Sequence, residues 1–394
     1  MAVYRVEINR DQKNDGIMAK SPNTKICCLL FLLLTGCATQ GLNTSNSNYE
    51  VRHRSYVGSQ EATATRFMDV STGIAPLHFP RYGQCQIKVP LKPDLHGLWI
   101  SGSVSEISNS IRACLSTAII EEVDVLILPE LALALPKENR EQLVDEMKTT
   151  AVDENMIIVG GSFYDEQRYN RLVVIGPDWV ELGYKMRPSR FEVSPLADKG
   201  MTAGEEIKIF KTDFGTIAVI TCVDLISDEI QYLMRSLATR QEIDVLANIN
   251  HNPAAWEFLI EANSIARRHP VFVSITNVNA DLGKKCIKDN ALNDNGYCYG
   301  HSAVFSSLRN GGPPNTSNSL LQMLPPPSIK YLEDGRPVGR KLPYSHIVGD
   351  IGSFREGMLI YELNMLMKQV PKTTNAPDQG YPPIRGIKIV DLHR

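Results

Sequence analysis

The feature that most constrains the fold is an alternation of short apolar segments with segments of helical periodicity. Residues 123–130 form a nearly continuous apolar run, and residues 217–221 form a shorter, β-branched one. Runs of this kind are typical of strands in a sheet that is covered on both faces. Further strand patterns occur at residues 98–101, which are the expected first strand, and at 156–163, 171–179, 244–250, 271–277 and 356–363. The alternation predicts an α/β fold in which helices pack over the faces of a sheet.

The segments between these strands have the apolar spacing of amphipathic helices. Ser105 is the expected N-cap of a first helix, in which apolar residues recur every three or four positions from Ile107 onward. Residues 138–152 form a second helix, a third begins at Ser227, and a fourth covers residues 256–268. No repeat period appears, so we expect one layered unit.

The N-terminal region has the features of a targeting signal. Lys20 and Lys25 precede an apolar run at residues 26–34, which is too short to span a bilayer but suits a signal peptide. The run ends in Leu-Thr-Gly-Cys37, which resembles a bacterial lipobox. We therefore predict a lipoprotein signal peptide at residues 1–36, with Met18 as an alternative start, and lipidation at Cys37. A buried apolar helix followed by a turn is the alternative.

The remainder of the chain divides by composition. Residues 37–80 are rich in Ser, Thr, Asn and Gly, which is typical of a flexible tether. Residues 81–370 are the expected folded domain, with a Pro- and Gly-rich insertion at 306–345, and residues 371–394 are an expected peripheral tail. The predicted location is the cell envelope, on a lipid anchor. Ala38 follows the cysteine, which by resemblance to Gram-negative sorting signals favours the outer membrane.

Composition and missing motifs exclude several function classes. Lys and Arg number 41 against 44 Asp and Glu, a net charge of -3, and no run of like charges occurs. We therefore expect no nucleic-acid partner and no basic membrane-binding surface. The sequence also lacks the glycine motifs of dinucleotide and nucleotide sites, Gly-x-Ser-x-Gly and His-Glu-x-x-His.

The eight cysteines do not form a zinc-binding pattern, because no matched pair of Cys-x-x-Cys motifs is present. In an exported protein, Cys286 and Cys298 are candidates for a disulfide within a polar loop. The alternative is two free thiols, because the sequence does not report the separation of their Cα atoms.

One cysteine stands at a structural corner. Cys222 follows the apolar strand 217–221 and precedes a helix that begins at Ser227. A helix N-terminus favours negative charge, so we expect a thiol in this position to be drawn toward thiolate. Read alone, a cysteine at the end of a strand is more often an inert core residue.

Two further polar residues stand at comparable strand ends. Glu130 follows a buried strand, and Lys185 follows the turn after residues 171–179. In open α/β sheets such strand ends are where sites are built. A carboxylate can take the proton of a thiol, and a lysine can stabilise an oxyanion. Together with Cys222, these residues suit acyl transfer at a C–N bond.

The segments that carry these residues resemble the nitrilase, or carbon–nitrogen hydrolase, superfamily. The resemblance rests on Leu128-Pro-Glu130, Tyr184-Lys185 followed by Phe191-Glu192, and residues 214–224 around Cys222. It covers roughly residues 98–305. It implies a four-layer αββα sandwich that pairs through a helical face, so a homodimer or higher homo-oligomer is expected.

The resemblance also implies roles for individual residues. Cys222 would be the nucleophile, Glu130 the general base, Lys185 the stabiliser of the tetrahedral intermediate, and Glu192 the second glutamate that positions substrate or water. The backbone N–H of Val223 would complete the oxyanion hole. This chemistry implies no metal and no organic cofactor.

The substrate is less constrained than the reaction. Val223-Asp224 after the cysteine looks more like the amidase and carbamoylase branches than the nitrile hydrolysers, which usually carry tryptophan there. His251, Asn252 and Trp256 follow a core strand and are candidates for a substrate loop, although Trp256 also fits packing on a helix face. We expect hydrolysis of a small amide or carbamoyl compound. The alternatives are an N-acyltransferase of the same superfamily and a non-catalytic envelope binding lipoprotein.

Overall fold

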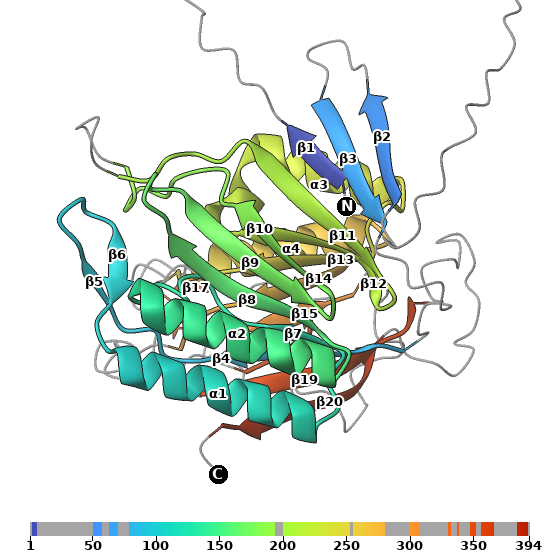
Figure 1. Ribbon diagram of the computed structural model, residues 1–394. Helices are drawn as coiled ribbons and strands as arrows, with labels where there is room; N and C mark the ends of the chain where they lie inside the picture. Colours follow the sequence, from blue (N-terminus) through green and yellow to red (C-terminus); the bar gives the residue numbers. More distant parts are fainter. Residues whose placement is uncertain are drawn as a thin grey trace, which may run out of the picture.

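The computed structural model describes residues 2–5, 50–56, 63–69, 79–193, 200–252, 255–279, 299–306, 330–331, 337–338, 347–351, 356–365 and 384–392. Two β-sheets pack face to face, and helices cover both outer faces (Figure 1). The α/β class and the αββα sandwich expected from the sequence are thereby confirmed.

The first sheet has nine strands in the order β18-β15-β14-β13-β12-β11-β1-β3-β2. Its centre, β12 to β14, is parallel, with Ile217 opposite Val245 and Val245 opposite Phe272. The strands are β1 (Ala2–Arg5), β2 (Glu50–Tyr56), β3 (Thr63–Asp69), β11 (Glu206–Thr212), β12 (Gly215–Thr221), β13 (Val245–Ile249), β14 (Phe272–Thr276), β15 (Ala303–Phe305) and β18 (Ile347–Asp350).

The second sheet has seven strands in the order β10-β9-β8-β7-β4-β19-β20. Strands β4, β7 and β8 are parallel, and the remaining pairings are antiparallel. The strands are β4 (Arg81–Gln86), β7 (Val125–Ile127), β8 (Ile157–Tyr164), β9 (Asn170–Gly176), β10 (Trp179–Tyr184), β19 (Gly357–Leu363) and β20 (Ile384–Asp391). Two small hairpins lie outside both sheets: β5 (Leu91–Pro93) with β6 (Trp99–Ser101), and β16 (Lys330–Tyr331) with β17 (Pro337–Val338).

The helices form the two outer layers. Helices α1 (Val104–Ile120) and α2 (Lys137–Asp153) lie together over the second sheet (Figure 1). Helices α3 (Asp228–Thr239) and α4 (Ala255–Arg268) cover the first sheet. A short 3-10 helix, η1 (Cys222–Ile226), connects β12 to α3. No helix within the described ranges is both long and apolar enough to cross a membrane.

Three buried clusters correspond to the three interfaces between the four layers. One contains Ile220, Leu246 and Phe258, where α3 and α4 meet the first sheet. A second contains Ile111 and Met147, where α1 and α2 meet the second sheet. A third lies between the sheets. It joins Val125, Ile127, Val219 and Ala247 with the stacked rings of Trp179 and Phe210. Alternate residues of β12 face opposite clusters, which explains why its sequence is apolar without interruption.

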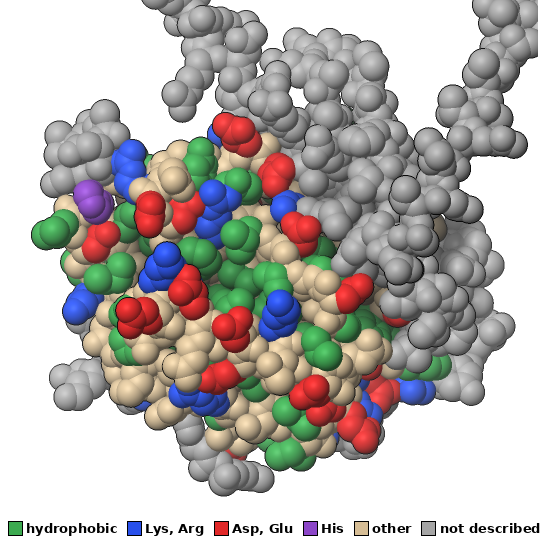
Figure 2. All heavy atoms as spheres, viewed as in Figure 1, with side chains coloured by type: hydrophobic (Ala, Val, Ile, Leu, Met, Phe, Trp, Pro, Cys, Tyr) green, Lys and Arg blue, Asp and Glu red, His purple; other side chains and the backbone are tan. Residues whose placement is uncertain are grey.

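The surface carries charges of both signs. Figure 2 shows basic and acidic side chains interspersed over one face of the molecule, among apolar and neutral polar groups. This distribution agrees with the small net charge of -3. The face shown has no extended patch of one sign among its described residues.

The element boundaries differ from the sequence expectations at several places. Helix α1 has Ser103, not Ser105, at its N-cap. The first strand of the core is β4, and residues 98–101 belong instead to the β5–β6 hairpin. Strands β2 and β3 lie within the expected tether, residues 37–80, and pair with each other. Strand β20 pairs with β19 inside the expected tail.

A disulfide joins the second sheet to its covering helix. Cys85 of β4 and Cys114 of α1 are bonded, with a Cα–Cα distance of 6.3 Å and a sequence separation of 29. Both residues are fully buried. No local pattern in the sequence predicts this pair, because β4 and α1 become neighbours only in the folded chain. The predicted pair, Cys286 and Cys298, lies outside the described residues, and so does Cys37.

Candidate active site

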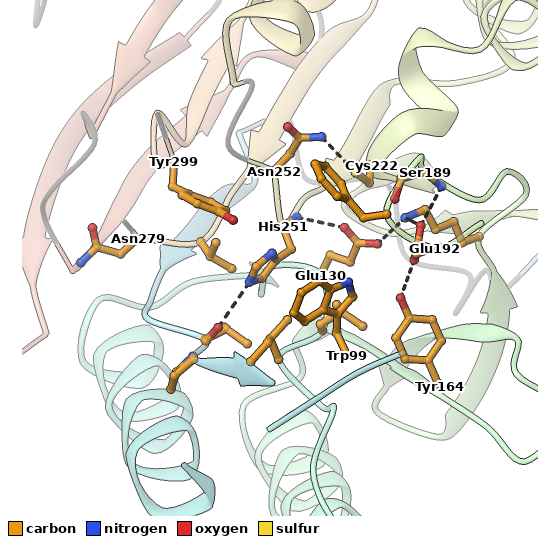
Figure 3. A pocket seen from close by; sticks show the side chains of 17 residues that line it. Trp99, Glu130, Tyr164, Ser189, Glu192, Cys222, His251, Asn252, Asn279 and Tyr299 are labelled. Atoms are coloured by element: carbon orange, nitrogen blue, oxygen red, sulfur yellow. Dashed lines mark hydrogen bonds and ion pairs between the residues drawn. The ribbon is translucent and has the colours of Figure 1, made fainter. Parts of the chain in front are cut away.

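A pocket of about 420 Å³ lies where both sheets end, and Cys222 is on its wall. Glu130 follows β7, Cys222 follows β12, and His251 follows β13, so the carboxyl ends of strands from both sheets supply its polar groups. Figure 3 shows Glu130, Glu192 and Cys222 converging on one side, with Tyr299 and Asn279 on the other.

Cys222 occupies a sharp corner of the backbone. Its φ of 50° is in the left-handed region, which a residue with a side chain rarely adopts. Two contacts hold the corner: Asn248 Nδ2 donates to the Cys222 carbonyl at 3.2 Å, and Thr221 and Asp224 form a capping box at the start of η1. Positive φ at a buried cysteine is a strained state that the surroundings must enforce. The corner therefore presents the thiol into the pocket.

Asp224 joins the Cys222 corner to the segment after Lys185. Its carboxylate accepts backbone N–H bonds from Thr221 at 3.3 Å, Met186 at 3.1 Å and Arg187 at 2.9 Å. Burial nevertheless raises the pKa of the fully buried Asp224 to about 7, although these N–H groups and Lys185 favour its charged form. The sequence carries a local signal for this role of Asp224, because an acidic residue three positions after Thr221 is the pattern of a capping box.

Glu130 is held by three donors. Its Oε1 accepts from Lys185 Nζ at 2.8 Å and from Asn170 Nδ2 at 3.0 Å, and its Oε2 accepts from the His251 backbone N–H at 2.9 Å. The side chain is 2% exposed. Burial raises the pKa of Glu130 above its ordinary value of 4.5, with Lys185 opposing this and the Glu192 charge adding to it. A carboxylate with a raised pKa is suited to accept a proton.

Lys185 lies between two carboxylates. Its Nζ is 2.8 Å from Glu130 Oε1 and 2.7 Å from Glu192 Oε2, and its side chain is 1% exposed. Burial alone would lower the pKa of Lys185, but the two carboxylates outweigh burial and raise it well above the ordinary value. Lys185 is therefore a fixed positive charge.

Glu192 is the second carboxylate of this ion chain. It accepts from the Ser189 backbone N–H at 2.8 Å and from the hydroxyl of Tyr164. Burial by itself raises the pKa of Glu192, whereas Lys185 and these donors lower it by more, so the net direction is downward. Glu192 stays ionised, and it anchors Lys185 from the side opposite Glu130.

The thiol of Cys222 is neutral at rest. Burial raises its pKa, and the Glu130 carboxylate raises it further, against the smaller opposing effect of Lys185. This corrects the expectation that the helix N-terminus draws the thiol toward thiolate. A short 3-10 helix begins at Cys222, and desolvation outweighs the effect of its dipole. Asn252 Nδ2 contacts the sulfur at 3.5 Å.

The other predicted site residues have different outcomes. His251 and Asn252 both line the pocket, and the His251 imidazole Nε2 lies 3.3 Å from the Val89 carbonyl oxygen. Val223 packs against the core under α3 and α4, and its backbone N–H role stays a prediction. The side chain of Trp256 lies outside the described part of the structure.

Two pocket contacts were not anticipated from the sequence. Asn170 and Tyr164 bind Glu130 and Glu192 from β9 and β8, and neither belongs to a local motif. Their only signal is a polar residue at the end of an apolar strand pattern.

In the described part of the chain, no group of three or more His, Cys, Asp or Glu side chains is arranged to hold a metal ion.

Comparison with known proteins gives the family. The model of the carbon–nitrogen hydrolase family matches residues 83–308, more than half of the chain. The chain belongs to the carbon–nitrogen hydrolase family. The match contains Glu130, Lys185, Glu192 and Cys222, so the pocket lies within the family domain. A comparison with curated protein sequences finds no match.

Several solved structures are similar to this carbon–nitrogen hydrolase at low sequence identity. XC1258 of Xanthomonas campestris, a CN-hydrolase superfamily protein, is 16% identical with a TM-score of 0.48, and the match covers 74% of this chain and 93% of that one. Nit3 of Saccharomyces cerevisiae, of branch 10 of the nitrilase superfamily, is 15% identical with a TM-score of 0.47, covering 76% and 96%. An amidase of Nesterenkonia sp. AN1 is 14% identical with a TM-score of 0.45, covering 74% and 94%.

Proposed function

We propose that this carbon–nitrogen hydrolase cleaves the C–N bond of a small amide or carbamoyl compound through a thioester on Cys222. The observation that carries the proposal is the buried ion chain from Glu130 through Lys185 to Glu192, which lines the same pocket as the Cys222 thiol. A neutral thiol beside a carboxylate with a raised pKa is a nucleophile and its base. The conclusion is a cysteine-dependent amide hydrolase.

The proposed reaction has two half-reactions. In the first, Glu130 takes the proton of Cys222 as the sulfur attacks the carbonyl carbon. The tetrahedral intermediate collapses with cleavage of the C–N bond, and Glu130 returns the proton to the leaving amine. In the second, Glu130 takes a proton from water, whose oxygen attacks the thioester. The acid leaves, and the proton returns to the sulfur.

Lys185 and the Cys222 corner stabilise the charge that develops on the carbonyl oxygen in this proposal. Lys185 is held rigidly by two carboxylates, so its ammonium group needs no rearrangement during the reaction. The backbone N–H of Val223 is the proposed second donor. Glu192 takes the role of a positioning residue that keeps Lys185 aligned.

The test is mass spectrometry of the intact protein during incubation with a panel of small amides. The expected result is an acyl adduct on Cys222, followed by release of the free acid and ammonia. The Cys222→Ala variant should form no adduct, and Ile120→Ala, at an exposed position on α1, is the matched control with full activity. Absence of both adduct and turnover across the panel contradicts the proposal.

The same experiment distinguishes the acyltransferase alternative. An added amine competes with water for the thioester, so transfer of the acyl group to that amine at the expense of the free acid indicates an N-acyltransferase. Release of free acid at an unchanged rate indicates a hydrolase.

We propose further that the enzyme is exported and tethered by lipid at Cys37. The lipobox-like sequence before Cys37 supports this location, and so does the Cys85–Cys114 disulfide, because disulfides persist mainly in oxidising compartments. Labelled palmitate should be incorporated into the native protein and not into Cys37→Ser. Incorporation that survives this substitution refutes the anchor.

A further inference from the structure

The walls of the pocket differ in chemistry from its reactive end. Apolar side chains make up much of the pocket lining, among them Val89, Leu91, Trp99 and Val278, and Tyr299 and Asn279 lie across from Cys222 (Figure 3). We infer that the acyl group accepted by this pocket is uncharged and apolar, an alkyl or aryl chain longer than acetyl. The inference rests on the proposed amide hydrolysis and names the substrate class of that same site.

The charges at the reactive end disfavour an anionic acyl group. Lys185 is the one cationic side chain among the described residues that line the pocket, and Glu130 and Glu192 already bind it. Arg187 contacts Glu229, and Arg190 lies at 4.7 Å over the ring of Phe191; neither arginine is among the residues that line the pocket. A substrate carboxylate would lose its hydration and find two carboxylates near it, which is strongly unfavourable.

A cationic acyl group is disfavoured for a related reason. Glu130 already accepts from Lys185, Asn170 and the His251 backbone, and Glu192 accepts from Lys185, Tyr164 and the Ser189 backbone. Asn279 Oδ1, which lines the pocket without a hydrogen-bond partner, is a neutral acceptor, so a substrate ammonium group would have to compete with these donors for a charged partner. Neutral substrates avoid both costs.

The β5–β6 hairpin supplies the wall that contacts the acyl chain. It carries Leu91 on one strand and Trp99 on the other, and Figure 3 shows Trp99 beside Glu130. The hairpin is fastened to the domain, since Ser101 N–H donates to the Ala134 carbonyl at 2.7 Å. A fixed apolar wall selects by the area of contact that the acyl chain buries.

The volume of the pocket sets the length expected of the chain. The pocket has a volume of about 420 Å³. An acetyl group fills a small part of it. Each further methylene buried against the wall should raise kcat/KM about fourfold until the pocket is full.

The test compares three amides of equal chain length: hexanamide, its ω-carboxylate analogue 6-amino-6-oxohexanoate, and its ω-amino analogue 6-aminohexanamide. Turnover is measured with the native protein, and binding with the Cys222→Ala variant. Hexanamide should exceed both charged analogues by at least about 100-fold in kcat/KM and in affinity. Acetamide is added as a short uncharged amide, and its kcat/KM should be lower than that of hexanamide.

Two variants locate the selectivity in the hairpin wall. Leu91→Ala should lower kcat/KM for hexanamide about three- to tenfold and leave that for acetamide nearly unchanged. Leu182→Ala is the matched control, because Leu182 is a half-exposed leucine on β10 that does not line the pocket, and it should change neither value.

The binding measurement separates this inference from the proposed function. Selective binding of hexanamide by Cys222→Ala supports the inference even if the native protein turns over no amide, a result that would reject the hydrolase. Equal or better binding and turnover of a charged analogue overturns the inference and leaves the hydrolase standing. Absence of binding of all three overturns the inference as well.

Discussion

Reduction of the Cys85–Cys114 disulfide should cost this protein about 3.6 kcal/mol of stability. The two cysteines are 29 residues apart, and the entropy of closing a loop of that length in the unfolded chain gives this value at 25 °C. With a urea dependence of about 3 kcal/mol per molar, the unfolding midpoint should fall by about 1.2 M. The disulfide acts mainly on the unfolded chain, so the folded pocket should keep its geometry.

The assay is urea unfolding followed by circular dichroism, with and without a phosphine reductant. Both sulfurs are fully buried, so the folded protein should resist the reductant for hours and lose the bond only on unfolding. The Cys85→Ala/Cys114→Ala variant should unfold at the midpoint of the reduced protein or slightly below it, because each substitution also removes a buried sulfur.

Two results would refute this reasoning. One is equal unfolding midpoints in the oxidised and reduced protein. The other is rapid labelling of Cys85 or Cys114 by a thiol reagent in folded, oxidised protein, which would mean that the bond is absent.

Three further predictions concern the buried charges. Because burial raises the pKa of Glu130, kcat/KM should fall on the acid side of the pH profile with a midpoint above pH 4.5. Glu130→Gln should lower kcat/KM about 10²- to 10⁴-fold. A midpoint at or below pH 4.5 would contradict the raised pKa. Lys185→Met leaves two buried carboxylates without their cation and should cost about 3–5 kcal/mol in urea unfolding, whereas a loss below about 1 kcal/mol argues against the ion chain. Asp224 holds its proton more tightly in the folded state, with a pKa of about 7 against 3.8, so its contribution to stability is complete below pH 3.8 and is lost as the pH rises toward 7. Asp224→Asn should flatten that part of the stability profile, and an unchanged slope would rule Asp224 out as its source.

The layered fold was predictable because apolar periodicity is local. The uninterrupted apolar run of β12 follows from burial of alternate side chains in two different clusters, and any chain with that pattern needs layers on both sides. The boundaries and pairing partners of the strands were less predictable. Residues 98–101 have a strand pattern, yet they pair with β5 in a hairpin and not with the core sheet, because pairing partners are chosen by long-range packing.

The order of Glu130, Lys185 and Cys222 along the chain predicted that they share a site, and all three line one pocket. Glu130 and Cys222 follow parallel strands, whose carboxyl ends meet at one edge, whereas Lys185 follows the antiparallel strand β10. Tyr164 and Asn170 were missed because their roles depend on which carboxylates they face. No spacing in the sequence encodes these pairings of Tyr164 and Asn170 with the two carboxylates.

The sequence by itself determined the α/β layering, the family and the chemical types of the reactive groups, because each of these depends on residue identity and local spacing. Only the tertiary structure decided the state of those groups. The Cys222 thiol is protonated, and Lys185 is kept positively charged by two carboxylates, because segments distant in the sequence exclude water and bring the charges together. The Cys85–Cys114 pairing was decided in the same way, by the contact of α1 with β4. Desolvation and proximity are properties of the packed chain, and they set the pKa values on which the proposed reaction depends.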